Sequence, residues 1–155
     1  MTVASTIPEI ATLRRDHPTT RFVDVLLADL CGIPRGKRVT IDELPAVYRG
    51  GFLLPGSMFA NDVLCGTIEA TGLGFDEGDG DRACLPIAGT LVPVPWCNED
   101  VAQVQVAMRD HDGTPFYGDP RHVLAGVRNT DPDSSKSTGC SQSHGAASCR
   151  RSSLM

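Results

Sequence analysis

The sequence lacks the short motifs that identify many common enzyme classes. Gly72, Gly74 and Gly78 do not have the GxGxxG spacing of a dinucleotide site, and no GxxxxGK[ST] phosphate loop occurs. Ser57 lies in no GxSxG nucleophile elbow. The acidic residues in segment 79–83 fail the calcium-loop pattern at its fifth position. No residue spacing therefore demonstrates an active site by itself.

Basic stripes and long apolar runs are also absent. The 155 residues carry a formal net charge of −5, with 41 % hydrophobic residues, and such an acidic chain does not favour nucleic-acid binding. No run approaches the roughly 20 apolar residues needed to span a bilayer. Residues 1–18 lack the apolar core of a signal peptide. We therefore expect a cytoplasmic protein without nucleic-acid or membrane partners.

Paired cysteine motifs are missing as well. None of the 6 cysteines forms a CxxC pair, which weakens a zinc or iron–sulfur interpretation, and we predict no metal ligands. Irregular spacing and the absence of a secretory signal do not favour disulfides. We expect buried or half-buried free thiols at the first four positions. These are Cys31, Cys65, Cys84 and Cys97.

A glycine-rich acidic stretch at residues 72–81 is the most distinctive segment present. It contains four glycines and four acids, at positions where neither a helix nor a regular strand is favoured. Apolar segments 52–59 and 83–96 flank it, which predicts a long loop held at both ends. Such loops are often functional. A solvated acidic turn is the alternative.

The first half of the chain predicts a helix, a hairpin and a second helix. Apolar spacing in residues 7–17 is helical, and residues 21–30 suit a buried strand that returns at residues 35–41. Asp42 is placed to cap a short helix. Three basic residues of the returning strand could clamp an anion, or could form a solvated edge that blocks strand pairing. These are Arg35, Lys37 and Arg38.

The second half predicts two strands and a helix. Residues 91–95 suit an edge strand between prolines, and the alternation in residues 101–109 predicts a half-buried strand. Asp119 and Pro120 open a helix whose apolar face contains Val123, Leu124 and Val127. Strands followed by few helices indicate an α+β fold, with a small mixed or antiparallel sheet packed on a helix.

Composition divides the chain into four parts. We assign residues 1–20 to an N-terminal helical segment, 21–118 to the main domain and 119–128 to a connecting helix. Residues 129–155 are Ser-rich, contain almost no large apolar residues and show no periodicity. Such a segment buries too little apolar surface to offset the entropy of ordering, so we expect a disordered tail.

Four segments in order carry a resemblance to a known family. They read VDVLLADLCGIPRGKRV, VYRGGFLLPGSMFANDV, EATGLGFDEGDGDRACLPIAGTLVPVPW and DGTPFYGDPRHVL. Together they cover roughly residues 21–127. This region resembles the N-terminal domain of the glutamine synthetase family, and it looks most like the γ-glutamylpolyamine (γ-glutamylputrescine) synthetase branch.

The resemblance implies a β-grasp fold and a ligase reaction. In the family, ATP phosphorylates the γ-carboxylate of glutamate, and an amine then displaces phosphate, with Mg²⁺ or Mn²⁺ as cofactor. The subunits form a homo-oligomeric ring, and each N-terminal domain closes the active site of a neighbour. Glutamate and the amine are the implied small-molecule partners.

One departure from the family lies in its amine site. Glutamine synthetases proper carry Asp-Gly-Ser-Ser there, whereas this chain has Pro55 in the place of the aspartate, followed by Gly56 and Ser57. Proline cannot hold a cation, which favours a bulkier amine than ammonia. Asp62 and Asp81 are the candidate carboxylates, although both could simply cap turns in loops.

The second departure is the absence of the family's catalytic domain after residue 128. Residues 129–155 cannot supply the metal-binding and phosphate-binding groups that phosphoryl transfer needs. We interpret this segment as an out-of-frame or truncated ending, so the chain binds no cofactor and is inactive alone. A fragment of a glutamate–amine ligase is one function class. A stand-alone binding module that adds its edge strand to a partner is the other.

Overall fold

The first two strands form the predicted β-hairpin. β1 (Phe22–Ala28) alternates half-buried and buried side chains, so Val23, Val25 and Leu27 face the interior. β2 (Pro34–Thr40) returns antiparallel along the whole of β1. The apolar run at residues 21–30 predicted the strand, and the structure shows which of its faces is buried.

The computed structural model describes residues 7–75, 78–97 and 100–130. Besides the hairpin, its elements are α1 (Pro8–Asp16), α2 (Leu44–Gly50), β3 (Phe52–Pro55), the short 3₁₀ helices η1 (Gly56–Ala60) and η2 (Glu69–Thr71), β4 (Asp81–Pro86), β5 (Val92–Pro93), β6 (Val101–Met108) and α3 (Pro120–Thr130).

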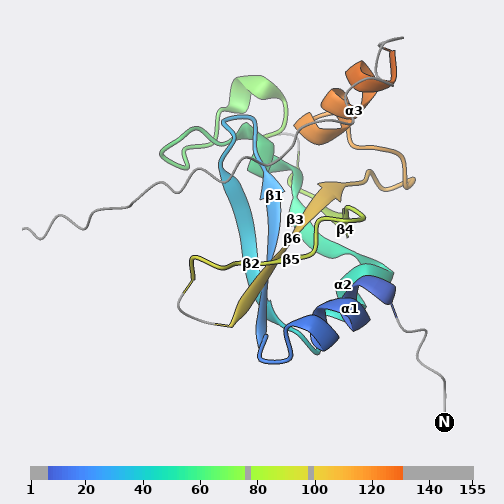
Figure 1. Ribbon diagram of the computed structural model, residues 1–155. Coiled ribbons are helices and arrows are strands. Elements are labelled where there is room, and N and C mark those ends of the chain that lie inside the picture. The colour runs from blue at the N-terminus through green and yellow to red at the C-terminus, as the bar shows by residue number, and fades with distance from the viewer. Residues whose placement is uncertain (1–6, 76–77, 98–99, 131–155) are drawn as a thin grey trace, which may run out of the picture.

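The strands form one mixed sheet in the order β2-β1-β6-β4-β3, with β5 paired to β6 outside this path. β1 and β6 run parallel, while the other pairs are antiparallel. β6 lies between β1 and β4 (Figure 1). It is therefore buried along most of its length rather than half-buried as the alternation predicted, and only Gln103 and Gln105 are intermediate. The mixed sheet with its helices confirms the α+β class.

Helices α1 and α2 pack against the sheet near the end where β1 begins, and α3 lies toward the opposite end (Figure 1). Each of the first two helices contributes two side chains to the core. They are Ile10, Leu13, Leu44 and Val47. The Tyr48 hydroxyl donates a hydrogen bond to the Glu9 carboxylate at 2.7 Å and so joins α2 to α1. Burial, and then this contact with Glu9, raise the pKa of Tyr48.

The start of α2 differs from the prediction that Asp42 caps it. The helix begins at Leu44, and no side chain caps it. Asp42 lies too far ahead of the first turn, and its carboxylate pairs with Arg14 at 2.6 Å. Glu43 instead accepts hydrogen bonds from the amide and hydroxyl of Thr40, both at 2.8 Å. These contacts fix the turn between β2 and α2.

The four cysteines of the described region are free, but two of them are not buried. Cys84 is buried in β4 and Cys97 is intermediate, whereas Cys31 and Cys65 are exposed. The prediction of buried thiols is wrong for Cys31 and Cys65 because both lie in surface turns. Burial, and then the nearby Asp119 carboxylate, raise the pKa of Cys84 to about 12.

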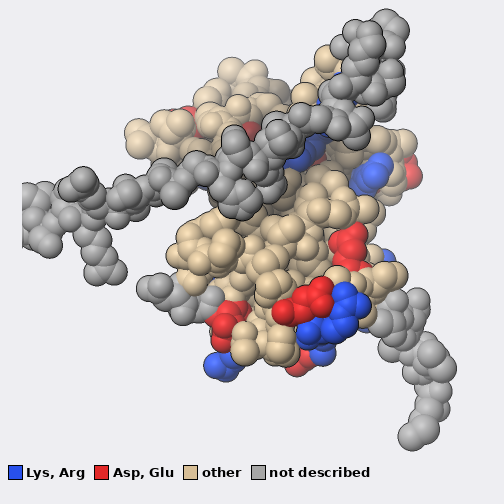
Figure 2. Space-filling model, viewed as in Figure 1, with Lys and Arg blue, Asp and Glu red and all other residues tan. Residues whose placement is uncertain are grey.

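The last helix presents apolar side chains to the surface. Val123, Leu124 and Val127 are 58 %, 56 % and 62 % exposed, although the sequence predicted an apolar face there. The face exists in the helix, but in this chain the sheet does not cover it. Figure 2 shows charged side chains gathered largely toward the end of the molecule where α1 lies, beside a broad surface without them.

The predicted tail falls almost entirely outside the described residues. Helix α3 continues two residues past the boundary expected at 128 and ends at Thr130, and residues 131–155 are not among those described. Within the described ranges, no helix combines the length and apolar content that a membrane crossing requires.

Candidate functional site

The glycine-rich loop is attached to η1 by one carboxylate. Asp79 accepts two hydrogen bonds from Ser57, one from the backbone amide at 3.1 Å and one from the hydroxyl at 2.7 Å. Ser57 is only 5 % exposed. The Asp79 carboxylate therefore satisfies both the amide and the hydroxyl of a buried serine. The loop is therefore anchored to the core rather than being a free acidic turn.

Arg82 of β4 lies beside the η1 turn that contains Gly56 and Ser57. Its Nε donates to Asp110 at 3.2 Å, Nη1 donates to the Gly80 carbonyl at 3.2 Å, and the guanidinium lies 4.5 Å from the centre of the Phe116 ring. The His111 amide and then the Arg82 guanidinium hold the pKa of Asp110 below its usual value, against the effect of burial. The guanidinium is thus fixed in orientation.

Gly56 lies close to this guanidinium. A Cβ at this position would lie 2.7 Å from Nη1 of Arg82 and 3.6 Å from the Phe116 ring. A side chain at position 56 would therefore force the guanidinium to shift from the place where it bonds Asp110. Gly56 and Ser57 are neighbours in the chain, and the fold places Asp79 and Arg82 beside them.

A small polar cavity of about 90 Å³ opens between η1, the loop and the start of β4. Its walls are Gly56, Gly72, Leu73, Gly74, Gly78, Asp79, Arg82 and Tyr117. Pockets for drug-sized ligands measure about 300–1,000 Å³. This cavity is therefore large enough for a small polar group and too small for a nucleotide.

Asp62 does not reach this cavity. Its Oδ1 accepts hydrogen bonds from the amides of Leu64 and Gly66, both at 2.8 Å, and so closes its own turn. The interpretation of Asp62 as a turn-capping carboxylate thus describes its geometry. Its backbone carbonyl also accepts a hydrogen bond from Arg35 at 3.0 Å. This contact ties the turn to the β1–β2 hairpin.

Asp81 is placed differently, at the first position of β4 and opposite Pro55 of β3. Residues directly opposite in an antiparallel pair have Cβ atoms about 4.5–5.5 Å apart. Asp81 is exposed, and within the described residues its carboxylate makes no ion pair or side-chain hydrogen bond. A carboxylate with no described partner therefore stands next to Pro55.

The basic residues of β2 do not form an anion clamp. Arg35 donates from Nε to Asp29 at 2.6 Å, and Arg38 donates to Asp24 at 2.8 Å, so both guanidinium groups already hold carboxylates. Lys37 lies 5.9 Å from the centre of the Phe52 ring. Since β2 ends the sheet order, these residues lie on an edge strand, as the alternative interpretation predicted.

Sequence reasoning did not identify Asp79, Arg82 and Tyr117 as neighbours of Gly56. Asp79 and Ser57 are 22 positions apart, and Arg82 and Asp110 are 28 apart. No local pattern reports such pairings. The available signal was the alternation of glycine and acid in the loop, which marked the segment but not the carboxylate that anchors it.

The residues of this region do not fit a metal site. No group of three histidine, cysteine or acidic side chains in the described part of the chain is arranged to hold a metal ion. Asp79 is satisfied by Ser57, and Arg82 contributes positive charge to the same cavity. We therefore derive no catalytic step through a metal held by this chain.

Known proteins are similar to this chain in sequence and in fold. No family model matches the chain. The chain is 43 % identical over 108 residues to γ-glutamylputrescine synthetase PuuA of Escherichia coli (strain K12), a match that covers 70 % of this chain and 23 % of that protein. The chain thus spans about a quarter of the length of this curated relative.

Solved structures share the fold at lower identity. A novel glutamine synthase homolog superposes with a TM-score of 0.62 at 22 % identity, over 71 % of this chain and 26 % of the other. GmaS without ligand superposes with a TM-score of 0.60 at 22 % identity, over 79 % and 26 % of the two chains. The sequence match and the shared fold confirm the resemblance of this chain to an N-terminal piece of the glutamine synthetase family.

Proposed function

We propose that this chain is a segment of an ATP-dependent glutamate–amine ligase, which makes γ-glutamyl amides through γ-glutamyl phosphate in nitrogen or polyamine metabolism. The similarity to γ-glutamylputrescine synthetase supports this assignment. The observation that carries it is the position of Asp81 opposite Pro55, beside the anchored Gly56–Ser57 turn. The same geometry supports an amine, rather than ammonia alone, as the acceptor.

In this proposal the segment forms the amine side of a shared active site. Asp81 attracts the cationic amine electrostatically. Its carboxylate is exposed and has no described partner, so no neighbouring cation neutralises its negative charge. Gly56 and Ser57 form the wall beneath it, because Asp79 and Arg82 hold that turn in place. Asp62 shapes the neighbouring turn and contributes charge at longer range.

ATP and Mg²⁺ or Mn²⁺ belong to the remainder of the active site in this proposal. The described residues offer no metal cluster, and the cavity beside Gly56 is too small for a nucleotide. The catalytic groups would come from another domain, within a homo-oligomeric ring in the cytoplasm. The chain alone would then be inactive, because positioning and charge stabilisation provide most of the catalysis in phosphoryl transfer.

A chimaera tests this proposal directly. Residues 21–127 of this chain replace the matching segment of the Escherichia coli γ-glutamylputrescine synthetase, and phosphate release is measured with glutamate, ATP, Mg²⁺ and putrescine. We expect Asp81→Asn to raise the KM for putrescine about tenfold and to leave the KM for ATP unchanged. Asp112→Asn is the matched control, since Asp112 is an exposed carboxylate bonded only to Thr114 in its own turn.

Two results would contradict the proposal. An unchanged putrescine KM in the Asp81→Asn chimaera would remove Asp81 from the amine site. Steady turnover by the 155-residue chain alone, free of host synthetase, would show that it is not a partial site. A folded but inactive chimaera, together with a partner bound along the exposed edge strand β3, would favour the stand-alone binding module.

A further inference from the structure

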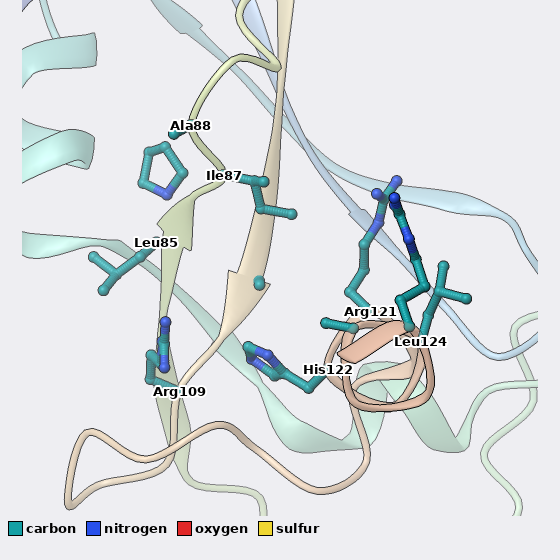
Figure 3. A pocket seen from close by; sticks show the side chains of 11 residues that line it. Leu85, Ile87, Ala88, Arg109, Arg121, His122 and Leu124 are labelled. Atoms are coloured by element: carbon teal, nitrogen blue, oxygen red, sulfur yellow. The ribbon is translucent and has the colours of Figure 1, made fainter. Parts of the chain in front are cut away.

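A second, larger cleft lies beside the strands β4 and β6. It has a volume of about 470 Å³ and runs between β4, the end of β6 and α3. Figure 3 shows Leu85 and Arg109 on the strand side, with Arg121 and Leu124 on the helix and His122 reaching from the helix toward the strands. This volume falls within the range of pockets that hold small organic ligands.

The charges in this cleft are all of one sign. Arg109, Arg121 and Arg128 line it, and no carboxylate is among its lining residues in the described part of the chain. The chain as a whole carries a net charge of −5. Three guanidinium groups without an intervening acid are therefore a local reversal of the overall charge, which favours an anionic ligand.

The arginines of this cleft differ from arginines elsewhere in the fold that are paired with carboxylates. Arg14, Arg35 and Arg82 each hold a carboxylate. By contrast, the side chains of Arg109 and Arg121 make no ion pair or hydrogen bond with any described residue, and the same holds for Arg128. Donors in a guanidinium that no described carboxylate occupies are available for a ligand.

The frame that presents these groups is rigidly built. The buried carboxylate of Asp119 accepts hydrogen bonds from the amide of Met108 at 2.7 Å and from the amide of Arg121 at 2.8 Å. His122 Nε2 lies 2.8 Å from the Met108 carbonyl oxygen. The first turn of α3 is thereby fastened to the end of β6. Arg109 follows that strand end directly, with its amide bonded to the Ala83 carbonyl at 2.8 Å.

Apolar walls stand beside the charged groups. Leu85 and Ile87 line the strand side, and Leu124 lines the helix side. Guanidinium groups bind carboxylate and phosphate oxygens through paired N–H donors, while aliphatic side chains accommodate a carbon skeleton. From these observations the geometry points to a binding site for a small oxyanion ligand, a phosphate ester or carboxylate, that carries an apolar body. This site is separate from the amine wall at Gly56.

Titration of the 155-residue chain with three probes tests the site. Phenyl phosphate and benzoate distinguish a phosphate from a carboxylate, and inorganic phosphate lacks the apolar body. Binding is followed by calorimetry and by amide chemical shifts in an NMR spectrum. We expect saturable binding of phenyl phosphate or benzoate, tighter than that of inorganic phosphate, with shifts centred on Ala88, Ala107 and Ala125, which line the cleft.

Substitutions separate this site from general attraction to surface charge. Arg121→Gln and Arg128→Gln should each weaken binding by about five- to tenfold, as expected for the loss of one charge-assisted hydrogen bond. Arg128 is exposed on the helix, so its variant keeps the test valid if Arg121→Gln unfolds. Arg49→Gln is the matched control, because Arg49 is an exposed arginine on α2.

The proposal predicts that the control binds like the unmodified chain. Absence of saturable binding by both phenyl phosphate and benzoate would overturn it. Equal weakening by Arg49→Gln, or amide shifts scattered over the arginines outside the cleft, would overturn it as well.

Discussion

Asp81 lies directly opposite Pro55 in the antiparallel pair of β3 and β4. The resemblance to the family implies an aspartate at the position of Pro55 in glutamine synthetases proper, from which this chain departs. Proline removes that charge and its backbone donor, but the neighbouring strand returns a carboxylate to the same part of the surface. In the amine site that we propose, the negative charge is therefore supplied from β4 instead of from position 55.

The first prediction concerns acceptor choice. In the chimaera with γ-glutamylputrescine synthetase, Pro55→Asp should increase kcat/KM for ammonium relative to putrescine by about tenfold. A second carboxylate opposite Asp81 would hold a compact cation closely and crowd a longer amine. Phosphate release with each acceptor measures the ratio. Pro55→Ala serves as the control, since it removes the proline without adding charge, and an equal shift in that variant would contradict the charge argument.

The second prediction concerns the close approach at Gly56. Gly56→Ala should destabilise the fold by about 1–3 kcal/mol, because the added Cβ would lie 2.7 Å from Arg82 Nη1 and force the guanidinium away from Asp110. Urea unfolding measures the change. Gly50→Ala is the matched control, since a Cβ there would meet nothing within 4 Å, and it should be neutral or slightly stabilising. Equal stability of the two variants would show that Arg82 moves without cost.

The third prediction separates the two hydrogen bonds at Asp79. Ser57→Ala removes the bond from the hydroxyl and should cost about 1 kcal/mol, whereas Asp79→Ala removes both bonds and should cost more. Hydrogen exchange of the Ser57 amide provides the readout. Protection should fall strongly in Asp79→Ala and weakly in Ser57→Ala. The reverse order would mean that this carboxylate does not anchor the loop.

The fourth prediction is a dependence of stability on pH at Asp29. Burial opposes ionisation of this carboxyl, but hydrogen bonds from Arg35 and from the amides of Ile33 and Cys31 lower its pKa below the usual value. Because the folded-state pKa is the lower one, its contribution is complete above the unfolded pKa of about 3.9 and is lost as pH falls through the folded value.

Asp29→Asn tests this linkage. The variant should lose about 3 kcal/mol at pH 7, since it leaves the Arg35 guanidinium without its carboxylate in a largely buried position. Urea unfolding at pH 7 and at pH 3 should show a smaller difference between variant and unmodified chain at the lower pH. A constant difference at both values would refute the assignment.

The fifth prediction concerns thiol reactivity. Cys31 and Cys65 are exposed, so iodoacetamide should modify both at neutral pH. Cys84 is buried and its pKa is raised to about 12, so it should react only when the chain unfolds. Mass spectrometry of the digested protein, with and without urea, distinguishes the sites. Rapid modification of Cys84 in the folded chain would contradict its buried position in β4.

Much of the fold could be predicted because its signals are local. The apolar run at residues 21–30 predicted the strand β1, and the pair Asp119–Pro120 predicted the start of α3. The same local reasoning failed at Asp42, because its carboxylate forms an ion pair with Arg14, which lies in another helix. It also placed β6 as a half-buried strand, because the alternation does not reveal how many neighbours a strand will have.

The candidate site was predicted less completely than the fold. By itself the sequence determined the three helices, the hairpin and β6, together with the α+β class and the resemblance to the family, because these signals involve residues that are neighbours in the chain. The strands β3 and β4 lie in segments that the sequence marked only as apolar. Only the tertiary structure decided that Asp79 anchors Ser57, that Asp62 closes its own turn and that Asp81 faces Pro55. The physical reason is that these three carboxylates are chemically alike, and only the order and register of the strands determine which polar groups each one can reach.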